Sequence, residues 1–72
     1  MKNTEAITER ERQVLYLISH EYTSDMIAKK LYISTHTATS HRKNLLAKLN
    51  AKNTAGLVRK AFEQKLLHLN FQ

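Results

Sequence analysis

The chain has 72 residues and a mass of 8.4 kDa, enough for one small domain but not for an additional sensory domain or an enzyme's cleft. It contains no Cys, which excludes disulfides and thiolate metal sites and favours a cytoplasmic location. Its longest apolar run is the five residues 14–18, far short of the roughly 20 that a membrane-spanning helix needs, so we expect no membrane partner.

Basic residues are concentrated in the middle of the chain, whose overall net charge is +6. The 37 residues from 26 to 62 contain eight Lys or Arg and no Asp or Glu, whereas the remainder contains four bases and six acids. A surface of one sign and this extent favours a polyanion such as nucleic acid or an anionic lipid surface. A merely solvated basic surface is the plain alternative.

Apolar residues recur every three or four positions, which predicts helices and no strands. The first helix begins at Thr8, where the spacing T-x-x-E is typical of a capping box formed with Glu11. Polar residues suited to capping also precede the other three periodic segments. These predicted caps are Thr23 or Ser24, then Ser34, then Asn53.

We therefore expect an all-α fold, a single compact four-helix domain covering residues 1–72 with an ordered core at about 6–67. The predicted helices span about 8–20, 24–31, 35–49 and 54–67. Only about three residues separate the second helix from the third, as in a helix-turn-helix, whose second helix enters the major groove of DNA. Apolar residues fall where two such helices would cross: Ile27, Leu31, Ile33, Ala38 and Leu45.

The predicted third helix has two unlike faces. Ala38, Leu45 and Leu49 form a narrow apolar stripe that we place against the core. The opposite face has no acid, although Glu–Lys pairs would be the ordinary choice for a merely solvated helix. Its residues are His36, Thr39, Ser40, Lys43 and Ala47. Small hydrogen-bonding side chains and one cation that can reach guanine suit a DNA groove. The flanking cations Arg42, Lys48 and Lys52 are predicted phosphate contacts, with Lys29 and Lys30 as weaker candidates.

Two other functions fit the same basic surface: a protein-interaction adaptor that docks on an acidic partner, and a non-specific nucleic-acid binder. The sequence has no Ser/His/Asp or Cys/His set, so we expect no enzyme, no cofactor and no small-molecule ligand. His36 and His41 are five positions apart and lie on different faces, which disfavours a metal site. We expect His41 to be packed and hydrogen-bonded rather than to contact phosphate.

Several linked segments resemble the LuxR-type helix-turn-helix domain, also called the FixJ or NarL type. Residues 8–15 are similar to its opening T-x-R-E-x-x-V-L, and residues 27–34 to its core I-A-x-x-L-x-I-S. Residues 37–54 resemble its T-V-x-x-H-x-x-x-I-x-x-K-L segment and the A-K-N-R-T that follows. The resemblance covers about residues 6–67 and implies a four-helix, DNA-binding transcription regulator, either stand-alone or cut from a longer response regulator.

The resemblance also implies roles for individual residues. Those facing bases are Thr39, Ser40 and Lys43, whereas Lys48 and Lys52 lie near phosphates. Further backbone candidates are Arg42, Ser34, Thr35, His36 and Thr37. Dimerisation is implied through the fourth helix, at Val58, Ala61 and Phe62, although by pattern alone its surplus apolar residues are either a dimer seam or a wider core contact. The implied partners are double-stranded DNA, a second copy of the chain and, as a further candidate, RNA polymerase.

The chain departs from the family pattern at helix ends and on the third helix. The family usually has Val and Lys where Ala38 and Thr39 stand, so its operator preference does not transfer. It commonly has Gly where Glu21 and Lys65 stand, and Tyr32 occupies a turn position that is often Gly in helix-turn-helix motifs. Because a left-handed backbone is costly without Gly, we expect the first helix to end differently and the fourth to continue.

Overall fold

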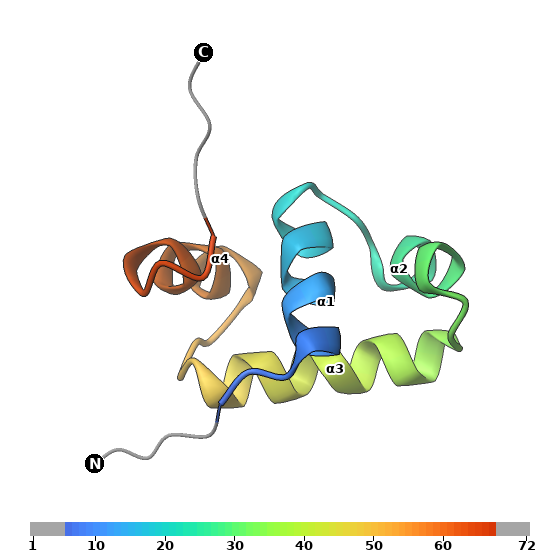
Figure 1. The fold of residues 1–72 in the computed structure, drawn as a ribbon, viewed down its shortest axis with the longest axis horizontal. Helices are drawn as coiled ribbons and strands as arrows, with labels where there is room; N and C mark the ends of the chain where they lie inside the picture. The colour runs from blue at the N-terminus through green and yellow to red at the C-terminus, as the bar shows by residue number, and fades with distance from the viewer. Residues whose placement is uncertain (1–5, 68–72) are drawn as a thin grey trace.

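The computed structural model describes residues 6–67, and the predictions for residues 1–5 and 68–72 lie outside this range. Within it the chain forms four helices and no strand, which confirms the all-α prediction (Figure 1). The helices are α1 (Glu9–Ser19), α2 (Ser24–Leu31), α3 (Thr35–Lys48) and α4 (Thr54–Glu63).

Every helix begins where its capping residue predicts. At α1 the Glu11 backbone N–H donates to Thr8 Oγ1 at 3.0 Å, and the Thr8 backbone N–H donates to Glu11 Oε1 at 3.0 Å. This reciprocal pair is the expected capping box. At the other three helices the N-cap side chain accepts from a backbone N–H three residues further on. Those N-caps are Thr23, Ser34 and Asn53.

The predicted ending is wrong in position for α4 and in conformation for α1, whose last residue, Ser19, lies close to the predicted end at about residue 20. The helix α4 stops at Glu63 rather than continuing to residue 67, because Lys65 adopts a left-handed backbone with φ of 65°. Glu21, after α1, likewise takes the left-handed conformation with φ of 68° that Gly was expected to require. Both residues accept a conformation that is costly for any side chain with a Cβ.

All four helices in fact share one type of ending, and none of them uses Gly. Each has a left-handed residue whose successor donates its backbone N–H to a carbonyl five residues back, as in the Schellman motif. The left-handed residues are Glu21, Tyr32, Asn50 and Lys65. The successors are apolar or aromatic and pack against the core: Tyr22, Ile33, Ala51 and Leu66. Burial of these successors offsets the cost of the left-handed backbone. The absence of Gly at the left-handed position therefore does not exclude this type of ending.

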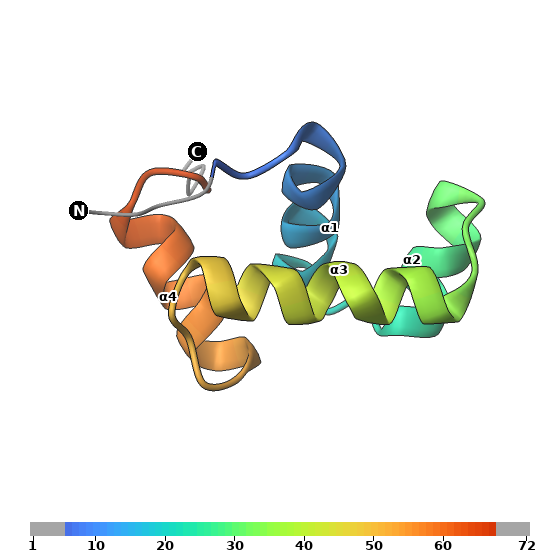
Figure 2. The ribbon, with the colours of Figure 1, turned by 90° about the horizontal axis from the view of Figure 1, so that it is seen from below.

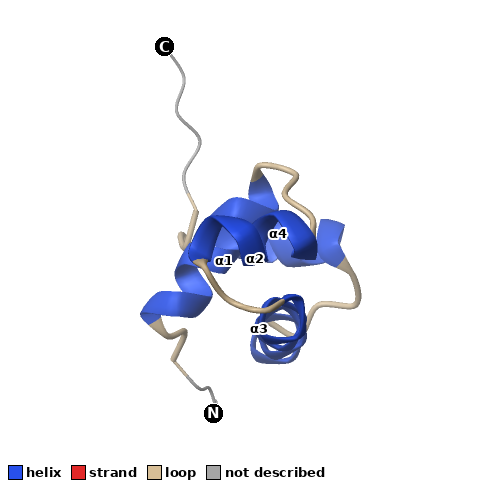
Figure 3. Ribbon diagram, turned by 90° about the vertical axis from the view of Figure 1, so that its right-hand side faces the viewer, coloured by secondary structure: helices blue, strands red, loops and turns tan. Residues whose placement is uncertain are grey.

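The helices are arranged around α1. In Figure 1, α4 and α2 lie on opposite sides of α1, and α3 runs across one side of all three. Figure 3, in which α3 is seen nearly end on, shows the other helices together on one side of it. The core lies between these layers and contains the predicted α3 stripe of Ala38, Leu45 and Leu49. Its other buried apolar members are Val14, Leu15, Leu17, Ile18, Ile27, Ala28, Leu57, Ala61 and Leu67.

Candidate nucleic-acid interface

The outer face of α3 is uncovered. Among the described residues, no other helix lies on the side of α3 that faces away from α1 (Figure 2). His36, Lys43 and Ala47 are exposed on that side, and Thr39 and Ser40 are half-buried. None of the five is buried in the core, so the structure brings the predicted base-reading residues together on one accessible surface.

Hydroxyl groups at the start of α3 are largely used within the domain. Ser34 Oγ accepts from the Thr37 backbone N–H at 3.0 Å and donates to Thr37 Oγ1 at 2.9 Å. Thr35 Oγ1 donates to Asp25 Oδ1 at 2.9 Å, which ties α3 to α2. A hydroxyl has one hydrogen to donate, and both Ser34 and Thr35 donate theirs within the domain. This differs from the prediction that their side chains contact the DNA backbone. The backbone N–H groups of Thr35 and His36 have no partner within residues 6–67 and point out of a helix N-terminus, which suits an anion.

Two of the predicted flanking cations, Lys52 and Arg42, are fully or partly accessible at the domain surface. Lys52 is exposed in the loop before α4. Arg42 is half-buried and its Nη2 donates to Thr54 Oγ1 at 2.9 Å, which links α3 to the start of α4. A guanidinium has five N–H donors, so this bond leaves others for a phosphate. On α2, Lys29 and Lys30 are both exposed.

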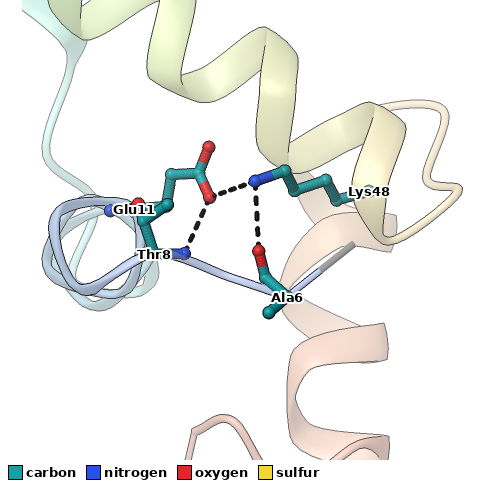
Figure 4. Close-up of polar contacts among 4 residues, drawn as sticks. All are labelled: Ala6, Thr8, Glu11 and Lys48. Carbon is teal, nitrogen blue, oxygen red and sulfur yellow. Dashed lines mark hydrogen bonds and ion pairs between the residues drawn. The ribbon is translucent and has the colours of Figure 1, made fainter. Parts of the chain in front are cut away.

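Lys48 has a different place from the one predicted. Its Nζ lies 2.8 Å from Glu11 Oε1 and 3.2 Å from the Ala6 carbonyl oxygen, as Figure 4 shows. Only 16% of the Lys48 side chain and 5% of the Glu11 side chain are exposed. The phosphate assignment of Lys48 is therefore corrected: its ammonium holds the C-terminal end of α3 to the N-terminal end of α1, and it faces the domain rather than an incoming duplex.

The same contacts set the protonation of Glu11. Burial of the carboxylate raises the pKa of Glu11, but hydrogen bonds from Lys48 and from the Thr8 backbone, together with the Lys48 charge, outweigh burial. The pKa of Glu11 therefore lies below the ordinary glutamate value. Glu11 is ionised at neutral pH, and one carboxylate serves both the capping box and the link to α3.

His41 is packed, as predicted, but it is not hydrogen-bonded through its inner nitrogen. The ring is half-buried, and its buried Nδ1 has no partner within the described residues. Across residues 6–67, no group of three or more His, Asp or Glu side chains is arranged to hold a metal ion. None of the described helices combines the length and apolar character that crossing a membrane requires.

The predicted dimer residues on α4 divide into two groups. Ala61 is 0% exposed and belongs to the core, so its assignment to a dimer interface is wrong. Val58 and Phe62 are half-buried and lie one helical turn apart, with part of each side chain at the surface. The exposed pair Arg59 Nε–Glu63 Oε2, at 3.0 Å, lies on the same helix.

Asn44 is a candidate base-reading residue that the sequence interpretation missed. It is exposed on α3, directly after Lys43 and one turn after Ser40. An amide side chain can pair with adenine in the major groove through two hydrogen bonds. The outer face was predicted from helical spacing that starts at His36, and position i+8 in that spacing was omitted. Position i+8 is Asn44.

A short turn followed by a helix with a free, acid-free outer face defines the class of the protein: a helix-turn-helix DNA-binding domain. Over residues 5–61 the sequence matches the family described as "Bacterial regulatory proteins, luxR family", and the chain belongs to this family. The resemblance drawn from the motifs is thereby confirmed. Domains of this type bind DNA in transcription regulators and response regulators.

Individual relatives agree with this assignment. The chain is 38% identical over 61 residues to the oxygen regulatory protein NreC of Staphylococcus carnosus, covering 85% of this chain and 28% of NreC. It is 39% identical over 66 residues to the transcriptional regulatory protein MctR of Rhizobium johnstonii, covering 92% of this chain and 31% of MctR. The chain thus spans under a third of the length of these curated relatives.

Two solved structures share the fold. One is the response regulator ChrA of a heme-sensing two-component system, with a TM-score of 0.85, 27% identity, and coverage of 92% of this chain and 33% of ChrA. The other is the transcription factor GerE, with a TM-score of 0.82 and 25% identity, covering 92% of this chain and all of GerE. The same fold therefore occurs both within a longer protein and as a whole chain.

Proposed function

We propose that this domain binds double-stranded DNA sequence-specifically, with α3 in the major groove. The observation that carries the proposal is the free outer face of α3, which bears short polar groups and one cation and no acid. Its base-reading residues are Thr39, Ser40 and Lys43, to which we add Asn44. Lys43 can donate to the guanine acceptors, and Asn44 can pair with adenine.

Contacts to the sugar–phosphate backbone fix the domain on the duplex. We assign them to Arg42, Lys52, the Thr37 hydroxyl and the two free backbone N–H groups at Thr35 and His36. Lys29 and Lys30 on α2 are weaker contributors. Lys48 is left out, because its ammonium is engaged with Glu11.

The proposed DNA-bound form is a homodimer that meets through α4 at Val58 and Phe62. Their partly exposed side chains lie one turn apart and would gain burial against a second copy. Two copies of α3 then address half-sites about one helical turn, roughly 10 bp, apart. We propose that such a dimer regulates transcription in the cytoplasm, alone or as the effector part of a longer regulator, with RNA polymerase as a further partner.

Selection from a random duplex library, repeated at two salt concentrations, tests this function. The proposal predicts recovery of a defined inverted repeat whose half-sites are about 10 bp apart. Its affinity should fall with added salt, but its preference over random duplex should persist, because base contacts carry no counterion term. Equal binding to all duplexes would instead indicate a non-specific coater, and no duplex binding would indicate a protein-interaction adaptor.

A further inference from the structure

A second surface of the domain is a wide groove along the exposed side of α1. Its volume is about 980 Å³, and its lining residues come from α1, from the end of α2, and from α4 and the turn after it, so α2 and α4 form its two banks. Figure 1 shows α2 and α4 on opposite sides of α1. The apolar and aromatic residues that line it are Tyr16, Leu17, Leu31, Phe62, Leu66 and Leu67. We propose that this groove binds an acidic amphipathic helix of a partner protein.

Several apolar and aromatic side chains around this groove remain partly exposed to solvent. Tyr16 stands in the groove with 55% of its surface exposed, against the ring of His20 at a centroid distance of 4.4 Å. Leu31, Phe62 and Leu66 are only half-buried although each packs against the core. Single exposed apolar residues are ordinary, but a contiguous group around one concavity indicates an interaction site.

The charge of the groove selects the partner. Its two ionic lining residues, Arg12 and Lys30, are both basic, and no acid lines it among the described residues. A second copy of this chain would bring like charges together at the groove, which is unfavourable. A partner with carboxylates beside its apolar residues would instead pair with Arg12 and Lys30 while burying the aromatic and aliphatic groups.

The shape of the groove selects a helix over an extended peptide. Residues 6–67 form no strand, so they offer no sheet edge to which an extended segment could add. An apolar trough between two helical banks matches the other common mode, in which the apolar stripe of an amphipathic helix lies in a hydrophobic groove.

The groove and the DNA-reading face are separate surfaces. None of its described lining residues comes from α3. The groove lies on the side of α1 opposite its buried residues Val14 and Ile18, whereas α3 packs on the buried side. A partner helix in the groove therefore leaves the outer face of α3 free for a duplex.

The proposal can be tested with a designed peptide and the isotope-labelled domain. The probe is a helical peptide of about 15 residues with Leu at i, i+4, i+7 and i+11 and Glu on the flanking positions. Its matched control carries Lys in place of each Glu. In an NMR titration we expect the acidic peptide to shift the amide signals of Tyr16, Leu31 and Phe62, and the basic peptide to leave them unchanged.

Two variants and one matched control locate the binding. Tyr16→Ala and Arg12→Glu should each weaken the acidic peptide about tenfold, because they remove the exposed anchor and reverse one charge. Arg10→Glu makes the same charge change on the same helix but outside the groove, and should alter affinity less than about twofold. Circular dichroism establishes that each variant is folded.

Three results would overturn the proposal. The basic peptide could bind equally well, the acidic peptide could shift α3 signals and be displaced by duplex DNA, or the signals of Tyr16 and Leu31, which are not part of the proposed α4 dimer contact, could shift with protein concentration alone. The last result would mean that a second copy occupies the groove. Tyr16→Ala should bind the selected duplex as the unmodified chain does, so a failure of the groove is distinguishable from a failure of DNA binding.

Discussion

The carboxylate of Glu11 joins three separate parts of the domain. It caps the start of α1, and it pairs with Lys48 at the end of α3, whose Nζ also contacts the Ala6 carbonyl. These contacts hold the end of α3 against the start of α1 and so orient the outer face of α3 relative to the rest of the domain. We therefore assign Glu11 and Lys48 a positioning role, because their charged groups contact each other.

Replacing this carboxylate tests the link. We expect Glu11→Gln to lower the free energy of unfolding by about 2 kcal/mol, because it removes a charged hydrogen bond and leaves Lys48 partly buried without its counter-charge. Urea denaturation measures the change. Glu63→Gln breaks an exposed pair of the same type and should change stability by less than about 0.5 kcal/mol. Equal effects of the two substitutions would contradict the structural role of Glu11.

The Glu11 link also makes stability depend on pH in one direction. Because the folded-state pKa of Glu11 lies below that of the unfolded chain, the stabilisation is fully present above the unfolded value of about 4.3. It is lost as pH falls through the lower folded-state pKa. Denaturation at a series of pH values should therefore show the stability gap between the unmodified chain and Glu11→Gln shrinking below about pH 4.3. A gap that stays constant with pH would be the contrary result.

Substitutions of two lysines distinguish the proposed base contacts from the proposed phosphate contacts. Lys43→Ala should weaken binding to the selected duplex by about 1–3 kcal/mol and relax specificity at one position, whereas Lys52→Ala should weaken all sequences alike and flatten the salt dependence. Competition binding against single-base variants, at two salt concentrations, measures both. If Lys43→Ala left the preferred site unchanged, the proposed orientation of α3 would be wrong.

At this scale the sequence predicts what is local and misses what is distant. The Thr8–Glu11 capping box was visible because its partners are three residues apart. Lys48 lies 37 positions from Glu11 in the sequence. Because Lys48 ends a basic helix, the sequence favours a phosphate contact, and only the fold shows that its partner is Glu11. Asn44 was within reach of sequence reasoning, since the complete helical spacing from His36 includes it.

At the scale of the element, local sequence likewise predicts where the helices start but not how they end. The four starts could be predicted because capping side chains are chemically distinctive. The ends of α1 and α4 could not be predicted from the absence of Gly at Glu21 and Lys65, since the left-handed residue is held by burial of the residue after it. The sequence does show an apolar or aromatic residue after each left-handed position. Whether that residue is buried, and so stabilises the helix ending, depends on the core, which the local sequence does not define.

The turn between α2 and α3 offers a direct measure of this backbone cost. Tyr32 is left-handed, with φ of 59°, and its side chain is 95% exposed. Tyr32→Gly should raise the free energy of unfolding by about 1 kcal/mol, after the greater freedom of Gly in the unfolded chain is counted. Thermal denaturation measures it. Tyr32→Ala removes the same aromatic group but keeps a Cβ, so an equal gain from Ala would show that the backbone is not the cause.

At the scale of the whole molecule, α1 lies between the two proposed binding surfaces. On one side α3 presents its free face (Figure 3), and on the other, residues of α1, α2 and α4 line the apolar groove. The general layout of four helices around one core was predictable from periodicity. The groove was not, because it depends on how α2 and α4 diverge from α1, and the burial of Ala61 likewise depends on which side of α4 meets the core.

In the proposed complex, α3 lies in the major groove with its outer face against the bases. NMR of the domain bound to the selected duplex tests it most directly, because thymine methyl groups lie in the major groove and report short distances to side chains. We expect intermolecular contacts between these methyl groups and the side chains of Thr39 and Lys43. Contacts to the duplex that arise only from residues outside α3, or only in the minor groove, would contradict it.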